Sequence, residues 1–187
     1  LVRKKIKSQF GGNLIAFISG GGPLDSEIGD TLNALGVKTL QGYGLTETSP
    51  VVSCNHLTDI KVETVGPILP NVEVKIADDG EILVRGEVLM IGYWNNDKAT
   101  NEIIRDGWLY TGDIGEFDSD GYLKITDRKK DIIVNLGGDN ISPSKIENIL
   151  CLNENIKQSF VYGDKKNYLV ALIVSEKEIN KEKIKLI

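Results

Sequence analysis

The densest group of chemically useful side chains in this sequence lies in residues 41–49, which read Gln-Gly-Tyr-Gly-Leu-Thr-Glu-Thr-Ser. Glycine lets the backbone approach a ligand closely, and the ring of Tyr43 offers a flat face with a polar tip. Thr46 can bond a phosphate or carboxylate oxygen, and the carboxylate of Glu47 is a hard oxygen ligand of the kind that Mg²⁺ takes. A strand that runs into a glycine turn is an equally good interpretation of these residues alone.

A glycine-rich turn precedes this group. Gly20, Gly21, Gly22 and Pro23 follow an apolar run, where the backbone could press against a flat base or a phosphate. Taken alone, they fit better a tight turn from a strand into a helix. They do not form a phosphate-gripping loop, because no Lys-Ser or Lys-Thr pair follows the glycines.

Later candidates either carry a charge or lack a side chain. Asp113 follows Gly112 at the expected end of a strand, where its carboxylate could take both hydroxyls of a ribose; a β-turn aspartate is the better interpretation in isolation. Arg128 could bind a ribose or a phosphate with its planar fork, or be one charge of a solvated run at a domain edge. Gly137 and Gly138 could admit a narrow substituent past the backbone, or form a plain turn.

Composition excludes several classes of function. The 187 residues are 41% hydrophobic and 26% charged, as in ordinary globular domains. A net charge of −5 provides no basic field for nucleic acid. His56 is the only histidine, which leaves no credible Ser-His-Asp set, and Cys54 and Cys151 have no metal-ligand spacing. No apolar run approaches the ~18 residues of a membrane span, so we expect a cytoplasmic protein, with peripheral membrane association left open.

The first fifty residues predict an α/β unit. An apolar run at 14–18, bounded by glycines, is typical of a buried parallel strand. Asp25 can cap a helix that ends at Gly36. A second strand from residue 37 then delivers residues 41–49 at its C-terminal end, where ligands bind in such folds.

After Pro50 the sequence predicts short antiparallel strands that form a barrel or curled sheet. The expected elements are strands at 72–76 and 81–86 joined by a turn at 78–80, a short strand at 90–94, a helix at 96–104, a strand ending at 108–111, and a turn at 118–121. The charged run 127–131 is a candidate linker. Beyond it we expect a strand at 132–136, a helix opened by Ser142 and Pro143, strands at 160–162 and 168–174, and a helix at 176–187.

Together and in this order, these motifs resemble those of the adenylate-forming superfamily, which includes acyl-CoA synthetases, the adenylation domains of peptide synthetases, and luciferase. The matching stretches cover essentially the whole chain. They are Gly22-Pro23-Leu24, residues 43–47, Gly80-Glu81 with Gly92-Tyr93-Trp94, Thr111-Gly112-Asp113, residues 127–131, and Gly137-Gly138 with residues 143–147. The run from Asp127 is most similar to long-chain fatty-acid–CoA ligases, because peptide synthetases usually carry Gly-Arg in place of Asp-Arg.

The resemblance implies a fold and a domain division. Residues 1–126 would be the C-terminal part of a large AMP-binding domain, with the edge of a parallel α/β layer in residues 1–50 and an antiparallel β-barrel-like subdomain in residues 51–126. Residues 127–187 would be part of a small C-terminal α+β domain that follows a hinge at Asp127. The strand at 14–18 should then be poorly covered in this chain.

The resemblance also implies a role for each site residue. Thr46 and Glu47 would be catalytic, with Glu47 holding Mg²⁺ and Thr46 contacting the α-phosphate or the acyl carboxylate. Asp113 and Arg128 would bind the ribose. Nucleotide-binding residues would be Gly20, Gly21, Gly22, Pro23, Gln41, Gly42, Tyr43, Gly44, Thr46, Asp113, Ile125 and Arg128, with Tyr43 stacked on the adenine, and CoA-binding residues would be Gly137, Gly138 and Asp139.

The implied reaction activates a fatty acid with ATP and transfers it to CoA, with Mg²⁺ as cofactor. Two alternatives remain: an adenylating enzyme with another acceptor, such as a carrier protein, and a non-catalytic nucleotide-binding or interaction module. The chain begins at Leu1 without methionine. The family's phosphate loop and its catalytic lysine are not in the sequence, so we expect a piece of a longer enzyme that is inactive by itself.

Overall fold

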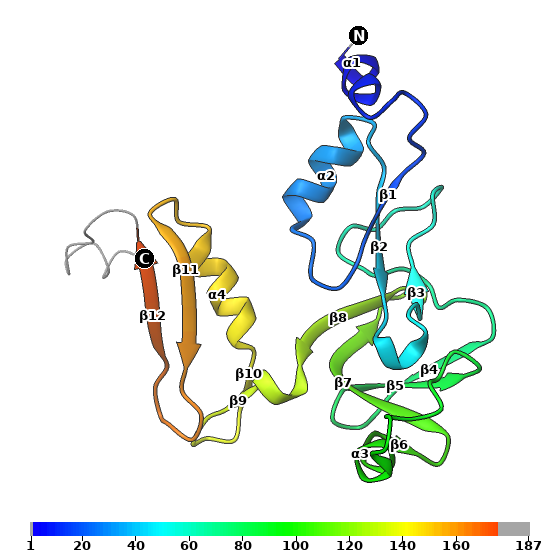
Figure 1. Ribbon diagram of the computed structural model, residues 1–187. Coiled ribbons are helices and arrows are strands. Elements are labelled where there is room, and N and C mark those ends of the chain that lie inside the picture. The colour runs from blue at the N-terminus through cyan, green and yellow to red at the C-terminus, as the bar shows by residue number, and fades with distance from the viewer. Residues whose placement is uncertain (1, 176–187) are drawn as a thin grey trace. The chain divides into compact units, whose positions relative to one another are not determined.

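The chain folds into two compact units, Leu1–Thr126 and Asp127–Ile187. The structure is a computed structural model that describes residues 2–175 (Figure 1). The helix expected at 176–187 lies outside the described residues. Among residues 2–175, none of the helices has the length and hydropathy of a membrane span.

The first unit opens with a small α/β layer. Its elements are α1 (Val2–Gln9), β1 (Phe17–Ser19), α2 (Ser26–Ala34), β2 (Thr39–Tyr43) and β3 (Ser53–Cys54). The strands pair in the order β1-β2-β3, with β1 parallel to β2 and β3 antiparallel to it (Figure 1). Asp25 caps α2 by accepting a hydrogen bond from the Ile28 N–H at 3.0 Å, and Gly36 follows the helix with φ +84°. The predicted α/β unit is confirmed.

The apolar run 14–18 is largely exposed, as the resemblance led us to expect, and not buried as the run alone predicted; only its last two residues lie in β1. Ile15 and Ile18 are 73% and 74% exposed, and β1 pairs with β2 alone. A continuous apolar run is typical of a strand that is covered on both faces. Here Phe10 packs edge-on against Phe17, with ring centroids 5.2 Å apart, while Ile15 and Ile18 stay largely uncovered.

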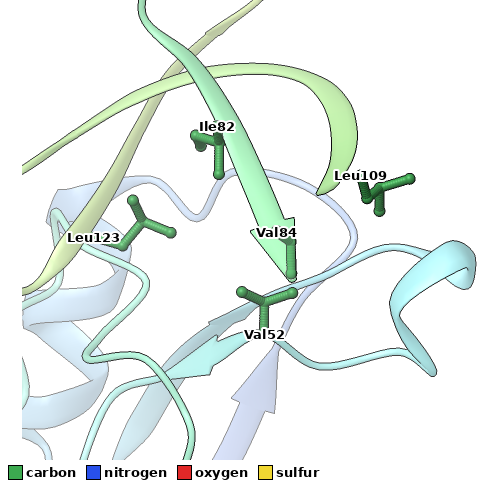
Figure 2. Close-up of a cluster of buried hydrophobic side chains, with 5 residues drawn as sticks. All are labelled: Val52, Ile82, Val84, Leu109 and Leu123. Carbon is green, nitrogen blue, oxygen red and sulfur yellow. The ribbon is translucent and has the colours of Figure 1, made fainter. Parts of the chain in front are cut away.

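The rest of the first unit is a curled antiparallel sheet, as predicted. Its elements are β4 (Val72–Ile76), β5 (Glu81–Gly86), α3 (Asp97–Ile103), β6 (Ile104–Arg105), β7 (Trp108–Phe117) and β8 (Leu123–Arg128). The order is β4-β5-β7-β6, and β8 pairs with β7. Buried side chains from this sheet and from the residue just before β3 make the core shown in Figure 2: Val52, Ile82, Val84, Leu109 and Leu123. This core joins the two parts of the unit, because Val52 lies beside β3.

Two predictions in this region are wrong. Residues 90–94 form a loop rather than a strand, because their backbone groups bind elsewhere: the Met90 N–H donates to the Glu47 carbonyl oxygen and the Tyr93 N–H donates to Thr100 Oγ1, both at 2.9 Å. The strand that begins at Trp108 also does not end at residue 111. It continues to Phe117, since β7 accommodates Gly112 at φ +72° as an irregularity inside the strand.

The second unit is a small α+β assembly, as predicted. Its elements are η2 (Lys129–Asp131), β9 (Ile133–Val134), β10 (Asn140–Ile141), α4 (Pro143–Cys151), β11 (Ile156–Tyr162) and β12 (Val170–Ser175). Gly138 turns the chain between β9 and β10 at φ +86°. Ser142 caps α4, and the Glu147 carboxylate accepts the Val161 N–H at 2.7 Å, which fixes α4 against the antiparallel pair β11-β12.

Candidate active site

The glycine-rich turn and the start of residues 41–49 lie at the same edge of the first layer. Ser19 pairs with Gln41 in the parallel register, so β1 and β2 end together. A Cβ atom on Gly20 would lie 3.4 Å from the Gly42 carbonyl oxygen, which shows how closely the two backbones pass. Gln41 ties them: its Oε1 accepts the Leu24 N–H at 3.2 Å, and its Nε2 donates to the Val62 carbonyl oxygen.

Gln41 therefore has a structural task that the sequence did not reveal. Its side chain is 8% exposed, and both ends of its amide bind backbone groups of the protein. Any contribution of this side chain to ligand binding would be indirect: through the hydrogen bond from Leu24, it holds the turn of Gly20–Pro23 beside β2.

Tyr43 and Asp113 meet although they are 70 residues apart in sequence. The Tyr43 hydroxyl donates to Asp113 Oδ2 at 2.7 Å. Asp113 is 3% exposed and lies in β7, whereas Tyr43 ends β2. This contact joins the α/β layer to the antiparallel sheet, so the aromatic residue and the carboxylate that sequence motifs singled out lie side by side.

The turn after Tyr43 exposes one threonine and buries another. Gly44 has no room for a side chain, because a Cβ atom would lie 1.7 Å from the Pro50 carbonyl oxygen. In η1 (Thr46–Thr48), the buried Thr48 hydroxyl accepts the Leu45 N–H at 2.9 Å and lies 3.0 Å from the Pro50 carbonyl oxygen. Thr48 therefore closes the turn, and Thr46 is left exposed at its surface.

Glu47 is held by the loop that was predicted to be a strand. The Tyr93 hydroxyl donates to Glu47 Oε1 at 2.6 Å, and the Met90 N–H donates to the Glu47 carbonyl oxygen. The carboxylate raises the pKa of the Tyr93 phenol above its ordinary value, chiefly through this hydrogen bond. Sequence reasoning did not pair Tyr93 with Glu47. The Gly-Tyr-Trp motif was the only signal that pointed to the loop.

Ile125 and the backbone around Asp113 connect the predicted site residues to the core of the first unit. Ile125 is half-buried and packs against the hydrophobic cluster of Figure 2. Asp113 itself sits on a distorted part of β7, where its N–H donates to Thr111 Oγ1 at 3.1 Å and the Thr111 hydroxyl donates to the Ile82 carbonyl oxygen at 2.7 Å.

Five predicted residues lie in the second unit: Asp127, Arg128, Gly137, Gly138 and Asp139. The first two are the last residues of β8, which crosses the boundary between the units. Arg128 is exposed. Asp127 is half-buried and accepts a hydrogen bond from the Ser142 hydroxyl at 2.7 Å, which links it to the first turn of α4. The Asp139 carboxylate accepts the Asn135 amide N–H at 2.8 Å, so it closes the β9-β10 turn around the two glycines. The expected meeting of Arg128 with the first-unit residues stays a prediction.

Comparisons with known proteins agree with these motifs. The family model for AMP-binding enzyme matches residues 2–94, and the model for AMP-binding enzyme C-terminal domain matches residues 130–186. The long-chain-fatty-acid–CoA ligase FadD15 of Mycobacterium bovis is 46% identical over 95% of this chain and 30% of that protein. The peroxisomal long chain acyl-CoA synthetase 6 of Arabidopsis thaliana is 39% identical over 94% of this chain and 27% of that protein. The chain thus spans about a third or less of the length of these relatives.

Solved structures show the same fold. The o-succinylbenzoate CoA synthetase of Bacillus subtilis, in complex with its acyl-adenylate intermediate, matches 98% of this chain and 42% of that chain, with 27% identity and a TM-score of 0.82. The same enzyme in complex with ATP and magnesium ion matches 91% of this chain and 38% of that chain, with 30% identity and a TM-score of 0.79. The chain belongs to the AMP-binding family of adenylate-forming enzymes, and its sequence is similar to long-chain-fatty-acid–CoA ligases.

Proposed function

We propose that this chain is part of an AMP-forming ligase that activates a long-chain fatty acid with ATP and transfers it to CoA. The observation that carries the proposal is the contact between Tyr43 and Asp113, which places an aromatic face beside a buried carboxylate at the C-terminal edge of β2. The names of the relatives support the fatty acid as substrate and CoA as acceptor.

The nucleoside would be bound by residues at the ends of β1 and β2 in the first layer and by residues of the antiparallel sheet. Gly20–Pro23 and the ring of Tyr43 would contact the adenine, with Gly42 and Gly44 allowing close approach of the backbone. Asp113 would accept both ribose hydroxyls. The Tyr43 hydroxyl donates to this carboxylate and would hold it beside the ribose. Arg128 would add a second contact to the ribose.

The phosphates would lie beside the exposed side of η1. Thr46 would contact the α-phosphate or the acyl carboxylate, and Glu47 would hold Mg²⁺. In the described part of the chain no group of three or more His, Cys, Asp or Glu side chains could hold a metal. A single carboxylate completed by phosphate oxygens and water is a usual arrangement for Mg²⁺, and Glu47 fits it. The bound ion would offset negative charge on the phosphates.

The reaction would have two halves. In the first, a carboxylate oxygen of the fatty acid attacks the α-phosphorus of ATP, the bond to pyrophosphate breaks, and acyl-AMP forms. In the second, the CoA thiolate attacks the acyl carbon and AMP leaves with the electron pair. Gly137, Gly138 and Asp139 would lie where the narrow arm of CoA enters after the small domain turns about Asp127.

The direct test uses the full-length enzyme and a series of carboxylic acids. Fatty-acid-dependent exchange of pyrophosphate into ATP measures the first half, and thioester formation with CoA or with an acyl carrier protein measures the second. We expect long-chain acids to support exchange and CoA to be the acceptor. If none of the fatty acids supports exchange, the proposal is overturned. Transfer to the carrier protein alone would reassign the acceptor.

A further inference from the structure

Resting on the proposed function, we propose that Glu81 is a positioning residue that holds the ribose-binding carboxylate of Asp113 in place. Glu81 begins β5, and its Oε1 accepts the Gly112 N–H at 2.8 Å. Gly112 immediately precedes Asp113. The backbone that aims the ribose-binding side chain is therefore held by a carboxylate from the neighbouring strand.

The burial of Glu81 needs such an explanation. A glutamate that follows a hairpin turn normally faces water, yet this one is 4% exposed. Taking a carboxylate out of water is costly unless hydrogen bonds compensate it. At Glu81 the structure supplies the Gly112 N–H. One partner of the buried carboxylate is thus the residue next to the proposed ribose ligand.

The pairing of β5 with β7 shows why Gly112 needs a partner. Glu81 pairs with Ile114 and Leu83 pairs with Tyr110, so Ile82 alone lies opposite residues 111–113. Such a bulge takes N–H groups out of the regular ladder. Side chains accept two of them here: Glu81 accepts the N–H of Gly112, and Thr111 accepts the N–H of Asp113.

Gly112 also makes the bulge dependent on its support. Its φ of +72° lies in the left-handed region, which glycine adopts at little cost and from which it also moves easily. Without the Glu81 acceptor, the Gly112 N–H would lose this hydrogen bond and the peptide could rotate. A rotation there would shift Asp113, since the two residues are adjacent.

The test compares nucleotides with and without ribose hydroxyls on the full-length enzyme. Glu81→Met keeps the volume and removes the acceptor. We expect it to raise the KM for ATP about tenfold. Loss of the hydrogen bond between Glu81 and Gly112 would displace Asp113 and so weaken the hydrogen bonds from the ribose hydroxyls to its carboxylate. The KM for 2′-deoxy-ATP and 3′-deoxy-ATP should change less, so the preference for ATP should shrink. Glu81→Gln keeps an acceptor oxygen and should restore most of the preference.

Glu73→Ala is the matched control. Glu73 lies on β4 of the same hairpin and pairs with Arg85 at the surface, away from the bulge. It should leave the preference for ATP unchanged. Thermal unfolding of each variant identifies loss of fold, and Glu81→Ala takes the place of Glu81→Met if the latter does not fold.

Asp113→Ala separates this inference from the proposed function. If Asp113→Ala retains the preference for ATP over the deoxynucleotides, the proposed ribose role of Asp113 is wrong. If Asp113→Ala loses the preference and Glu81→Met keeps it, the positioning role of Glu81 is overturned while the proposed function stands. An equal rise in the KM for ATP and for both deoxynucleotides in Glu81→Met would also overturn the positioning role, because it would indicate a general structural role for Glu81.

Discussion

Glu47 illustrates how much a single side chain depends on distant parts of the chain. Its carboxylate accepts a hydrogen bond from Tyr93, and its backbone carbonyl accepts one from Met90. The loop at residues 87–96 thereby fixes a side chain that we expect to hold Mg²⁺. Thr48 fixes the turn from the other side. The protein's own hydrogen bonds therefore set the geometry of the proposed metal ligand.

We expect Glu47→Gln in the full-length enzyme to slow acyl-AMP formation roughly 100-fold, a magnitude typical of losing one group that stabilises the transition state. ATP binding should weaken much less, because the amide keeps the size of the side chain and removes only its charge. Equilibrium titration with ATP and single-turnover release of pyrophosphate would measure the two effects. A binding loss as large as the rate loss would instead indicate a structural role for Glu47.

The same substitution should lower the pKa of the Tyr93 phenol toward its ordinary value, since the carboxylate that raises it is gone. Tyr122 is the internal control, because Asp59 and not Glu47 raises the pKa of its phenol. A pH titration of tyrosine ring carbons by NMR would follow both residues. A raised pKa stabilises the folded state at pH values below the unfolded value of about 10, and the stabilisation is lost as pH rises through the folded value. Glu47→Gln should therefore reduce the loss of stability at alkaline pH, and Asp59→Asn should affect Tyr122 alone.

At the level of elements, the glycines of the two turns have different tasks. Gly44 has the Pro50 carbonyl oxygen 1.7 Å from where a Cβ atom would lie, whereas nothing lies within 4 Å of a Cβ atom on Gly22. Gly44 is therefore required by the fold. Gly22 is free of that requirement, and we propose that its small size allows a ligand to approach closely.

Gly44→Ala should destabilise the full-length enzyme by about 1–3 kcal/mol or more, the usual cost of forcing extra volume into a packed site. Gly22→Ala should change stability by less than about 0.5 kcal/mol, as is typical of surface changes, and should weaken ATP binding. Chemical denaturation and ATP titration of both variants would test the difference. Comparable destabilisation by both substitutions would show that the turn at Gly22 is also packed.

The elements that could be predicted from the sequence are those fixed by local signals. The bounds of β4 follow from alternating apolar residues, the start of β5 follows from the turn at Gly80, and the start of α4 follows from Ser142 and Pro143. Residues 90–94 were misread because their hydrogen-bond partners, Glu47 and Thr100, lie outside the run. The bulge in β7 was misread as a strand end because Thr-Gly-Asp has the composition of a turn. Motifs thus identified the candidate residues, whereas the contacts of Glu81 and Tyr93 required the fold.

At the scale of the whole molecule, the chain divides between Thr126 and Asp127. The sharpest change in composition, the charged run 127–131, begins at the same place. Asp127 is bound on the side of the second unit, where its carboxylate accepts the Ser142 hydroxyl that also caps α4. A rotation of the small domain about Asp127 would keep this contact if the dihedral angles of Asp127 itself absorb the change.

Asp127→Pro tests the proposed hinge in the full-length enzyme. Proline fixes φ near −65° and restricts the preceding residue, Thr126, so it should block a rotation at this position. We expect acyl-AMP formation to stay largely intact and transfer to CoA to slow, because only the second half-reaction would need the rotated small domain. Pyrophosphate release and thioester formation from preformed acyl-AMP would be measured separately.

Asp127→Ala is the control that makes this experiment specific. It removes the hydrogen bond from Ser142, as Asp127→Pro does, but leaves the backbone free to rotate. A hinge at Asp127 requires that proline slow the transfer step much more than alanine does. If both variants slow transfer alike, the contact with Ser142 matters and the backbone rotation does not. If proline damages both half-reactions equally, the substitution has disturbed the fold or the nucleotide site. An unchanged transfer rate in Asp127→Pro would place the pivot elsewhere, with Arg128 to Lys130 as the next residues to test.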